Sequence, residues 1–218
     1  MIKILLVIFK LILSHPFTRG YKLISVINFF KWKFKLHFLN RSFIVDWVNG
    51  TKFHVMKGES GLTGHLYFGL QEYEDMSFLL HFLKKTDFFY DIGANVGSYT
   101  ILASGVVGCH SKCFEPVPET FNKLLDQIKL NRISSLAEAR NIGVSNKNDK
   151  LDFTNNLNCM NHVSNDPSSK NITEVNVIAL DTTYDPISPS IAKLDVEAHE
   201  KFVMDGGKNF SPIQMLLR

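Results

Sequence analysis

The sequence has little cysteine, and what it has forms no recognisable site. Its three cysteines, Cys109, Cys113 and Cys159, are an odd number, with no C-x-x-C pair and no matching arrangement of histidines. A disulfide framework and a zinc site built on cysteine pairs are therefore both disfavoured. We expect reduced thiols with packing roles in a cytoplasmic protein.

Long hydrophobic runs are also lacking. Apolar stretches cover residues 4–9 and 11–13, but Lys10, His15 and Pro16 interrupt them before the roughly 20 apolar residues that a membrane-spanning helix needs. No small-x-small cleavage site follows this basic, apolar start, so a secretory signal peptide is the weaker alternative. With 45% hydrophobic and 21% charged residues, the composition is that of a globular protein.

Acidic residues are almost absent from the first quarter of the chain. Residues 1–57 contain ten lysines and arginines and one acid, Asp46, whereas residues 58–218 contain fourteen basic and twenty acidic residues. These counts give net charges of +9 and −6. We expect a basic, apolar extension over residues 1–57 and a domain over residues 58–218.

The extension contains one helix-like segment and one hairpin signal. Residues 21–39 mix four lysines with aromatic residues, which is typical of an amphipathic helix at a membrane surface. A helix that packs on the domain and keeps its lysines in water fits equally well, so peripheral membrane contact stays open. No zinc, helix-turn-helix or aromatic RNA-binding motif is present, so no nucleic-acid partner is expected. Asn49-Gly50 between two apolar runs predicts a β-hairpin that starts near residue 41.

From about residue 86 the pattern alternates short apolar strands with helical periodicity, which is typical of a parallel α/β sheet. A helix is predicted over residues 118–131 from the spacing of its apolar side chains, and another over residues 68–85. Residues 150–180 interrupt the alternation and predict a hairpin inserted between the third and fourth strands. The predicted strands are residues 88–92, 112–116, 137–144, 190–196 and 212–217.

The stretch DIGANVG after the first predicted strand has the character of a ligand-binding turn. Asp91 ends the strand, and Gly93 and Gly97 allow a tight turn into a helix whose N–H groups are available as donors. The G-x-G-x-x-G spacing of dinucleotide enzymes is absent. Glu115 ends the next strand, where a carboxylate can accept hydrogen bonds from both hydroxyls of a ribose. Each feature alone fits a capped turn or a solvated acid; together they favour a nucleoside ligand without a pyrophosphate.

Four segments in order, DIGANVGSYT, FEPVPETFNKLL, ARNIGVS and AKLDVEAHEKFVMDGG, resemble the motifs of the FkbM family of S-adenosylmethionine-dependent methyltransferases. The resemblance covers roughly residues 60–218 and implies a Rossmann-like class I methyltransferase sheet, with helices on both faces, an inserted β-hairpin between strands 3 and 4 and a helical basic N-terminal extension. It implies that S-adenosyl-L-methionine is the cofactor. The implied cofactor-binding residues are Asp91, Gly93, Asn95 and Gly97 at the methionine part, Glu115 and Pro116 at the ribose, and Asn141, Ile142 and Gly143 at the adenine.

The fourth motif supplies candidates for the chemistry. An acceptor hydroxyl must lose its proton during methyl transfer, and a carboxylate or imidazole near the sulfonium can take it. Asp195, Glu197 and His199 are therefore candidate catalytic residues. The alternatives are that Asp195 orients a loop, Glu197 caps the following helix and His199 lies on the surface. This cluster has no metal-ligand geometry, so no metal is expected.

Two departures from the family pattern qualify the resemblance. Ala198 stands where the family usually has glycine, and an alanine calls for an ordinary backbone conformation. The sequence also stops within the expected fifth strand, which predicts a C-terminally incomplete domain.

We therefore expect an O-methyltransferase acting on a small-molecule or carbohydrate acceptor, of unknown oligomeric state. The alternative is a non-catalytic S-adenosylmethionine-binding protein. An NAD-dependent oxidoreductase is disfavoured by the glycine spacing.

Overall fold

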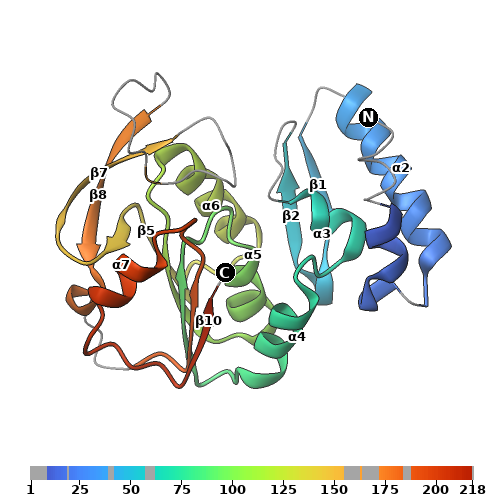
Figure 1. Ribbon diagram of the computed structural model, residues 1–218. Helices are drawn as coiled ribbons and strands as arrows, with labels where there is room; N and C mark the ends of the chain where they lie inside the picture. The colour runs from blue at the N-terminus through green and yellow to red at the C-terminus, as the bar shows by residue number, and fades with distance from the viewer. Residues whose placement is uncertain are drawn as a thin grey trace. The chain divides into compact units, whose positions relative to one another are not determined.

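The computed structural model describes residues 9–18, 20–38, 42–56, 62–154, 163, 172–183 and 188–217. The chain divides into two compact units, Met1–Phe78 and Leu79–Arg218 (Figure 1). The boundary expected between residues 57 and 58 lies outside the described residues, so the extension and domain assigned there stay a prediction.

The N-terminal unit combines a long basic helix with a small hairpin. Residues 9–14 are helical, and the ring of Phe9 lies 5.6 Å from that of Phe29. The expected hairpin is confirmed as an antiparallel pair, in which Asn49 and Gly50 take left-handed φ angles of 49° and 80°. The elements are η1 (Pro16–Thr18), α2 (Lys22–Phe38), β1 (Phe43–Asp46), η2 (Val48–Gly50), β2 (Lys52–Val55), α3 (Thr63–Phe68) and α4 (Tyr73–Phe82), whose last turn belongs to the second unit.

An aromatic cluster forms part of the core of the N-terminal unit. The Trp47 ring lies 4.3 Å from Phe53 and 5.2 Å from His65, and its indole N–H donates to the Gly69 carbonyl at 2.6 Å. Burial lowers the pKa of His65 to about 4, although a hydrogen bond with the Gly69 backbone opposes this shift. His65 is therefore a neutral core residue at neutral pH.

The single helix expected over residues 68–85 is wrong in its first turn. Gly69 takes a left-handed φ of 81° and ends α3, and α4 begins only at Tyr73. A left-handed residue cannot continue a right-handed helix, and glycine adopts that conformation at little cost. Among the described residues, no helix is both long enough and apolar enough to cross a bilayer.

The C-terminal unit is built on a five-stranded parallel sheet with the order β10-β9-β3-β4-β5. β6, β8 and β7 form a second, smaller sheet, in which β7 and β8 are the expected inserted hairpin. The helices and strands in chain order are β3 (Phe88–Ile92), α5 (Ser98–Thr100), η3 (Ile101–Val107), β4 (His110–Phe114), α6 (Pro118–Leu130), β5 (Ala137–Arg140), β6 (Gly143–Ser145), β7 (Asp149–Thr154), β8 (Ile172–Ala179), η5 (Leu180–Thr182), β9 (Ile191–Leu194), α7 (Glu200–Asp205) and β10 (Gln214–Leu217).

Helices cover both faces of the parallel sheet, as expected. From β3 the chain moves outward through β4 to β5, and from β9 it moves in the opposite direction to β10. Because crossovers between parallel strands are right-handed, α5 and α6 lie on one face and α7 on the other (Figure 1). The structure thus has the predicted Rossmann-like α/β fold.

One predicted strand is wrong in extent. Residues 137–144 do not form one strand but separate at Asn141 and Ile142 into β5 and β6. β6 leaves the central sheet because Gly143 and its neighbours pair with β8 of the insertion instead. The strand pattern alone could not show this change of partner.

Candidate functional site

The centre of the sheet carries a buried ion pair at the carboxyl ends of its strands. Asp91 on β3 and Lys193 on β9 are direct neighbours in the parallel ladder, and their side chains are 0% and 4% exposed. Lys193 Nζ lies 3.5 Å from Asp91 Oδ1 and 3.3 Å from Asp195 Oδ2, and it donates to the Gly93 carbonyl at 3.0 Å. One ammonium group therefore joins the end of β3 to the end of β9.

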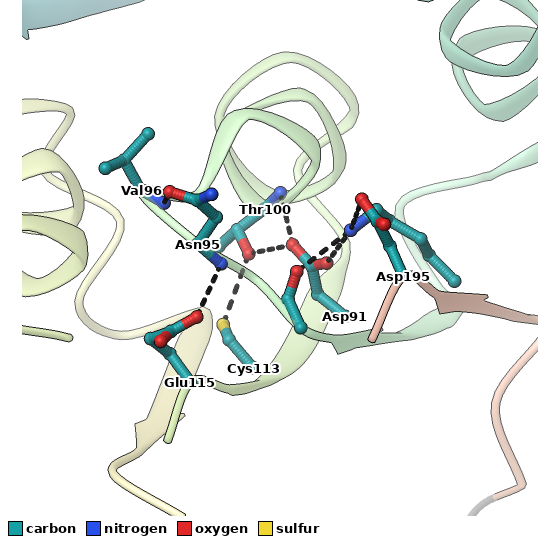
Figure 2. Close-up of polar contacts among 9 residues, drawn as sticks. Asp91, Asn95, Val96, Thr100, Cys113, Glu115 and Asp195 are labelled. Atoms are coloured by element: carbon teal, nitrogen blue, oxygen red, sulfur yellow. Dashed lines mark hydrogen bonds and ion pairs between the residues drawn. The ribbon is translucent and has the colours of Figure 1, made fainter. Parts of the chain in front are cut away.

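The second oxygen of Asp91 holds the start of the following helix (Figure 2). Oδ2 accepts hydrogen bonds from the Thr100 N–H at 3.1 Å and from the Thr100 hydroxyl at 2.7 Å. The Thr100 oxygen also lies 3.3 Å from Cys113 Sγ. Burial raises the pKa of the Cys113 thiol to about 12, and that of Cys109 likewise, so both keep their protons. The third cysteine, Cys159, lies outside the described residues. Through Thr100, the buried Asp91 side chain holds the helix that follows the turn of residues 93–97.

Backbone geometry explains the glycines of the turn. Gly93 and Gly97 have left-handed φ angles of 76° and 87°, and Asn95 between them has 51°. A Cβ on Gly93 would lie 1.9 Å from the Asp195 carbonyl oxygen, and one on Gly97 would lie 2.5 Å from Leu124 Cδ1 of α6. Gly93 is therefore required by the close approach of the Asp195 backbone, and Gly97 is favoured by its left-handed φ, both apart from any ligand.

Glu115 is a buried carboxylate held by backbone donors. Its Oε2 accepts the Asn95 N–H at 3.0 Å (Figure 2). Its Oε1 accepts the Val117 N–H, also at 3.0 Å. Because each carboxylate oxygen has two acceptor positions, one on each remains for a further donor. Burial raises the pKa of Glu115 to about 7, against the opposing effect of these two N–H groups.

One cavity at the carboxyl ends of β3, β4 and β9 brings most of the predicted residues together. Its apolar wall, which the sequence did not reveal, comes partly from Val117, Val144 and Phe153. Phe153 reaches it from β7 of the inserted hairpin. The predicted residues that line it are Gly93, Asn95, Glu115, Pro116, Gly143, Asp195, Glu197 and His199.

Two predicted adenine contacts do not line this cavity. The Asn141 side-chain amide donates to the carbonyls of Glu115 and Pro116, both at 2.9 Å, and so holds the turn after β4. Ile142 packs against the hydrophobic core that includes Val203 of α7. Both positions support the site from outside its wall.

The loop after β9 has an unusual backbone. Glu197 and Ala198 have φ angles of 46° and 66°, so the expectation that Ala198 needs an ordinary conformation is wrong. A left-handed conformation is unfavourable for an alanine, whereas a glycine would adopt it at little cost. The Ala198 N–H donates to Glu200 Oε1 at 3.2 Å, and the N-cap residue of α7, His199, makes no side-chain capping hydrogen bond.

His199 is not a surface residue. It is 9% exposed, its Nε2 lies 2.9 Å from Ser145 Oγ, and its ring stacks on Phe202 with centroids 4.6 Å apart. Burial lowers the pKa of His199, so its imidazole is neutral at neutral pH. A neutral imidazole at the cavity wall can accept a proton.

The sequence reasoning missed Lys193. Alternation along AKLDV places Lys193 on the same face of its strand as Asp195, but its pairing with Asp91 depends on the register of β3 and β9, which the sequence alone does not give. In the described part of the chain, no group of three or more histidine, cysteine or acidic side chains has the geometry of a metal site.

Comparison with known proteins assigns the family. A parallel sheet with a cavity at its carboxyl ends is the arrangement of ligand-binding α/β proteins. Residues 91–217, more than half of the chain, match the methyltransferase FkbM domain. The chain belongs to the FkbM methyltransferase family.

Among curated proteins, the chain is similar to the hexuronic acid methyltransferase AglP of Haloferax volcanii, with 25% identity over 140 residues. The match covers 63% of this chain and 57% of that protein, so the chain spans little more than half the length of this relative.

Two solved structures are more distant. The tRNA (uracil-54, C5)-methyltransferase of Pyrococcus abyssi, in complex with S-adenosyl-L-homocysteine, is 8% identical with a TM-score of 0.49, over 81% of this chain and 34% of that one. The tRNA m1G37 methyltransferase of M. jannaschii is 13% identical with a TM-score of 0.43, over 77% and 39%.

Proposed function

We propose that this protein transfers a methyl group from S-adenosylmethionine to a hydroxyl oxygen of a small or carbohydrate-like acceptor. The observation that carries the proposal is the convergence of Glu115 and Asp195 on one cavity, from the strands on either side of β3. Membership of the FkbM family supports it.

The chain's residues fit this cofactor. Glu115 keeps one acceptor position on each oxygen, which suits the two hydroxyls of a ribose. Val117, Val144 and Phe153 offer the apolar surface that an adenine needs, and Gly93 and Asn95 of the turn line the same cavity, where they would contact the methionine part. When bound, S-adenosylmethionine supplies a methyl group activated by the sulfonium.

Asp195 is the proposed general base. Lys193 holds its Oδ2 at 3.3 Å and fixes the orientation of the carboxylate, which lines the cavity and is 33% exposed. The carboxylate then takes the proton of the acceptor hydroxyl through its other oxygen. His199 is the second candidate, because its buried imidazole is neutral, although Ser145 engages its Nε2.

A second cavity provides a place for the acceptor. It shares Glu197 and His199 with the first cavity and extends past Lys147 and Phe202. A half-exposed aromatic ring beside polar side chains suits a sugar ring, and Lys147 suits an acidic one. The name of the similar Haloferax protein, a hexuronic acid methyltransferase, supports this acceptor class.

The test combines cofactor binding with turnover. Calorimetry with S-adenosylhomocysteine should show binding to the parent protein and to Glu119→Ala, an exposed glutamate on α6, and loss of binding to Glu115→Ala. Mass spectrometry of uronic-acid oligosaccharides incubated with S-adenosylmethionine should detect methylation.

Asp195→Asn should keep S-adenosylhomocysteine binding while turnover falls on the order of 100-fold or more. If the parent protein does not bind S-adenosylhomocysteine, the proposal is wrong. Binding without methylation of any acceptor would favour a non-catalytic binding protein.

A further inference from the structure

Helix α2 has apolar side chains on two opposite faces. On the inner face, Phe29 is fully buried and its ring lies 4.8 Å from Tyr67 of α3. The outer face carries an apolar stripe whose members are spaced i, i+4, i+7 and i+11, which places them in line on a helix. We call this the outer stripe: Leu23, Ile27, Phe30 and Phe34, which are between 52% and 74% exposed.

Lysines border the outer stripe. At about 100° per residue, Lys22 and Lys33 fall along one edge of it and Lys31 along the other. All three are exposed, and α2 contains four lysines and no acidic residue. Their long aliphatic stems can lie beside the apolar side chains of the stripe while their ammonium groups stay in the polar surroundings.

This pattern is the reverse of an ordinary surface helix. A helix that packs on one face normally shows polar side chains on the other. The exposed apolar surface of these side chains is unfavourable in water, and an apolar patch with a polar rim marks an interaction surface. The outer stripe therefore needs an occupant.

We propose that the outer stripe of α2 docks this protein on an anionic lipid surface, with the helix lying in the plane of the membrane. The charges select this occupant. A second copy of the chain packed stripe to stripe would bring the two sets of lysines together, which like-charge repulsion opposes. Anionic headgroups instead pair with the lysines while the stripe enters the acyl boundary.

Flotation of the full chain with phosphatidylcholine vesicles, with and without phosphatidylserine, tests the docking. The parent protein should float with the phosphatidylserine vesicles and bind them more weakly as salt rises. The triple variant Leu23→Gln, Ile27→Gln, Phe34→Gln should bind at least about tenfold more weakly. Lys22→Gln and Lys31→Gln should each weaken binding roughly fivefold.

A matched control separates the stripe from exposed apolar surface in general. Ile213 lies in the C-terminal unit and is 69% exposed, and the variant Ile213→Gln should float as well as the parent protein. Circular dichroism should show that every variant keeps the parent's helix content, since the replaced side chains are exposed. Docking and methyl transfer involve different units, so each can fail without the other.

Several outcomes would overturn the proposal. The first is a parent protein that does not float, or that floats equally with both vesicle types. The triple variant could float as well as the parent, which would assign binding to another segment. Analytical ultracentrifugation could show a dimer that the stripe substitutions dissociate. Binding to nucleic acid that depends on the lysines but not on the stripe would also contradict it.

Discussion

The two units depart from the usual distribution of residues in opposite ways. In the N-terminal unit, large apolar side chains such as Leu23 and Phe34 stay at the surface. In the C-terminal unit, charged side chains such as Asp91, Glu115 and Lys193 are buried. Each departure is unfavourable to folding. The exposed apolar side chains suit an apolar partner outside the N-terminal unit. The buried charges suit a polar ligand inside the C-terminal unit.

The largest effect is expected at Lys193. Lys193→Met removes the ammonium beside the fully buried Asp91, and breaking a buried pair costs about 3–5 kcal/mol of unfolding free energy. Lys150→Met removes an exposed ion pair with Glu174 and should cost far less, because water and salt screen that pair. Chemical denaturation measures both values.

The double variant Asp91→Asn, Lys193→Met should recover part of the loss, because no buried charge is left unpaired. In the N-terminal unit, Ile27→Gln should change stability by less than about 0.5 kcal/mol, since the side chain is already 56% exposed. If Lys193→Met and Ile27→Gln lowered the free energy of unfolding equally, the contrast between a buried charge and an exposed apolar side chain would be wrong.

The two units should respond to pH with opposite signs. The folded pKa of His65, about 4, lies below the usual histidine value of 6.5, so the unfolded state binds more protons and the N-terminal unit loses stability as pH falls through this window. The folded pKa of Glu115, about 7, lies above 4.5, so the folded state binds more protons and the C-terminal unit loses stability as pH rises from 4.5 to 7. Each full effect is roughly 3 kcal/mol.

Tryptophan fluorescence can separate the two responses. Both tryptophans, Trp32 and Trp47, lie in the N-terminal unit, so their unfolding transition reports on that unit alone. Hydrogen exchange in β3 and β4 reports on the other. Glu115→Gln should abolish the decline in the C-terminal unit and leave the tryptophan transition unchanged; a shift of both together would mean that the units unfold as one.

A smaller gain in stability is expected at Ala198. Its φ of 66° costs an alanine roughly 1–2 kcal/mol, and part of the gain from glycine is offset by the greater freedom of the unfolded chain. Ala198→Gly should therefore raise the free energy of unfolding by about 0.5–1 kcal/mol. Ala179→Gly, at an ordinary φ of −66°, should lower it instead. A loss of stability at both positions would contradict the left-handed conformation.

Local patterns predicted the parts of the fold that depend on local chemistry. Asn49-Gly50 predicted its hairpin because only a few residues adopt left-handed φ angles easily, and the alternating strands predicted the parallel sheet. The position of Glu115 at a strand end predicted a carboxylate at the cavity, because parallel strands share one ligand-binding edge.

Features that depend on distant partners were not predictable in the same way. β6 leaves the central sheet because it pairs with β8, more than thirty residues later. Lys193 is buried because Asp91, a hundred residues earlier, lies opposite it. A lysine in a strand is ordinarily exposed, so its role is visible only once the ladder register is known.

The most direct test of the central claim, that Glu115 holds the cofactor, is the pH dependence of S-adenosylhomocysteine binding. Because the pKa of Glu115 is raised to about 7, only about a tenth of this carboxylate is ionised at pH 6. The dissociation constant of the parent protein should therefore rise about tenfold between pH 8 and pH 6, whereas Glu115→Gln should bind weakly with little pH dependence. The same affinity and the same pH dependence in both proteins would contradict the claim.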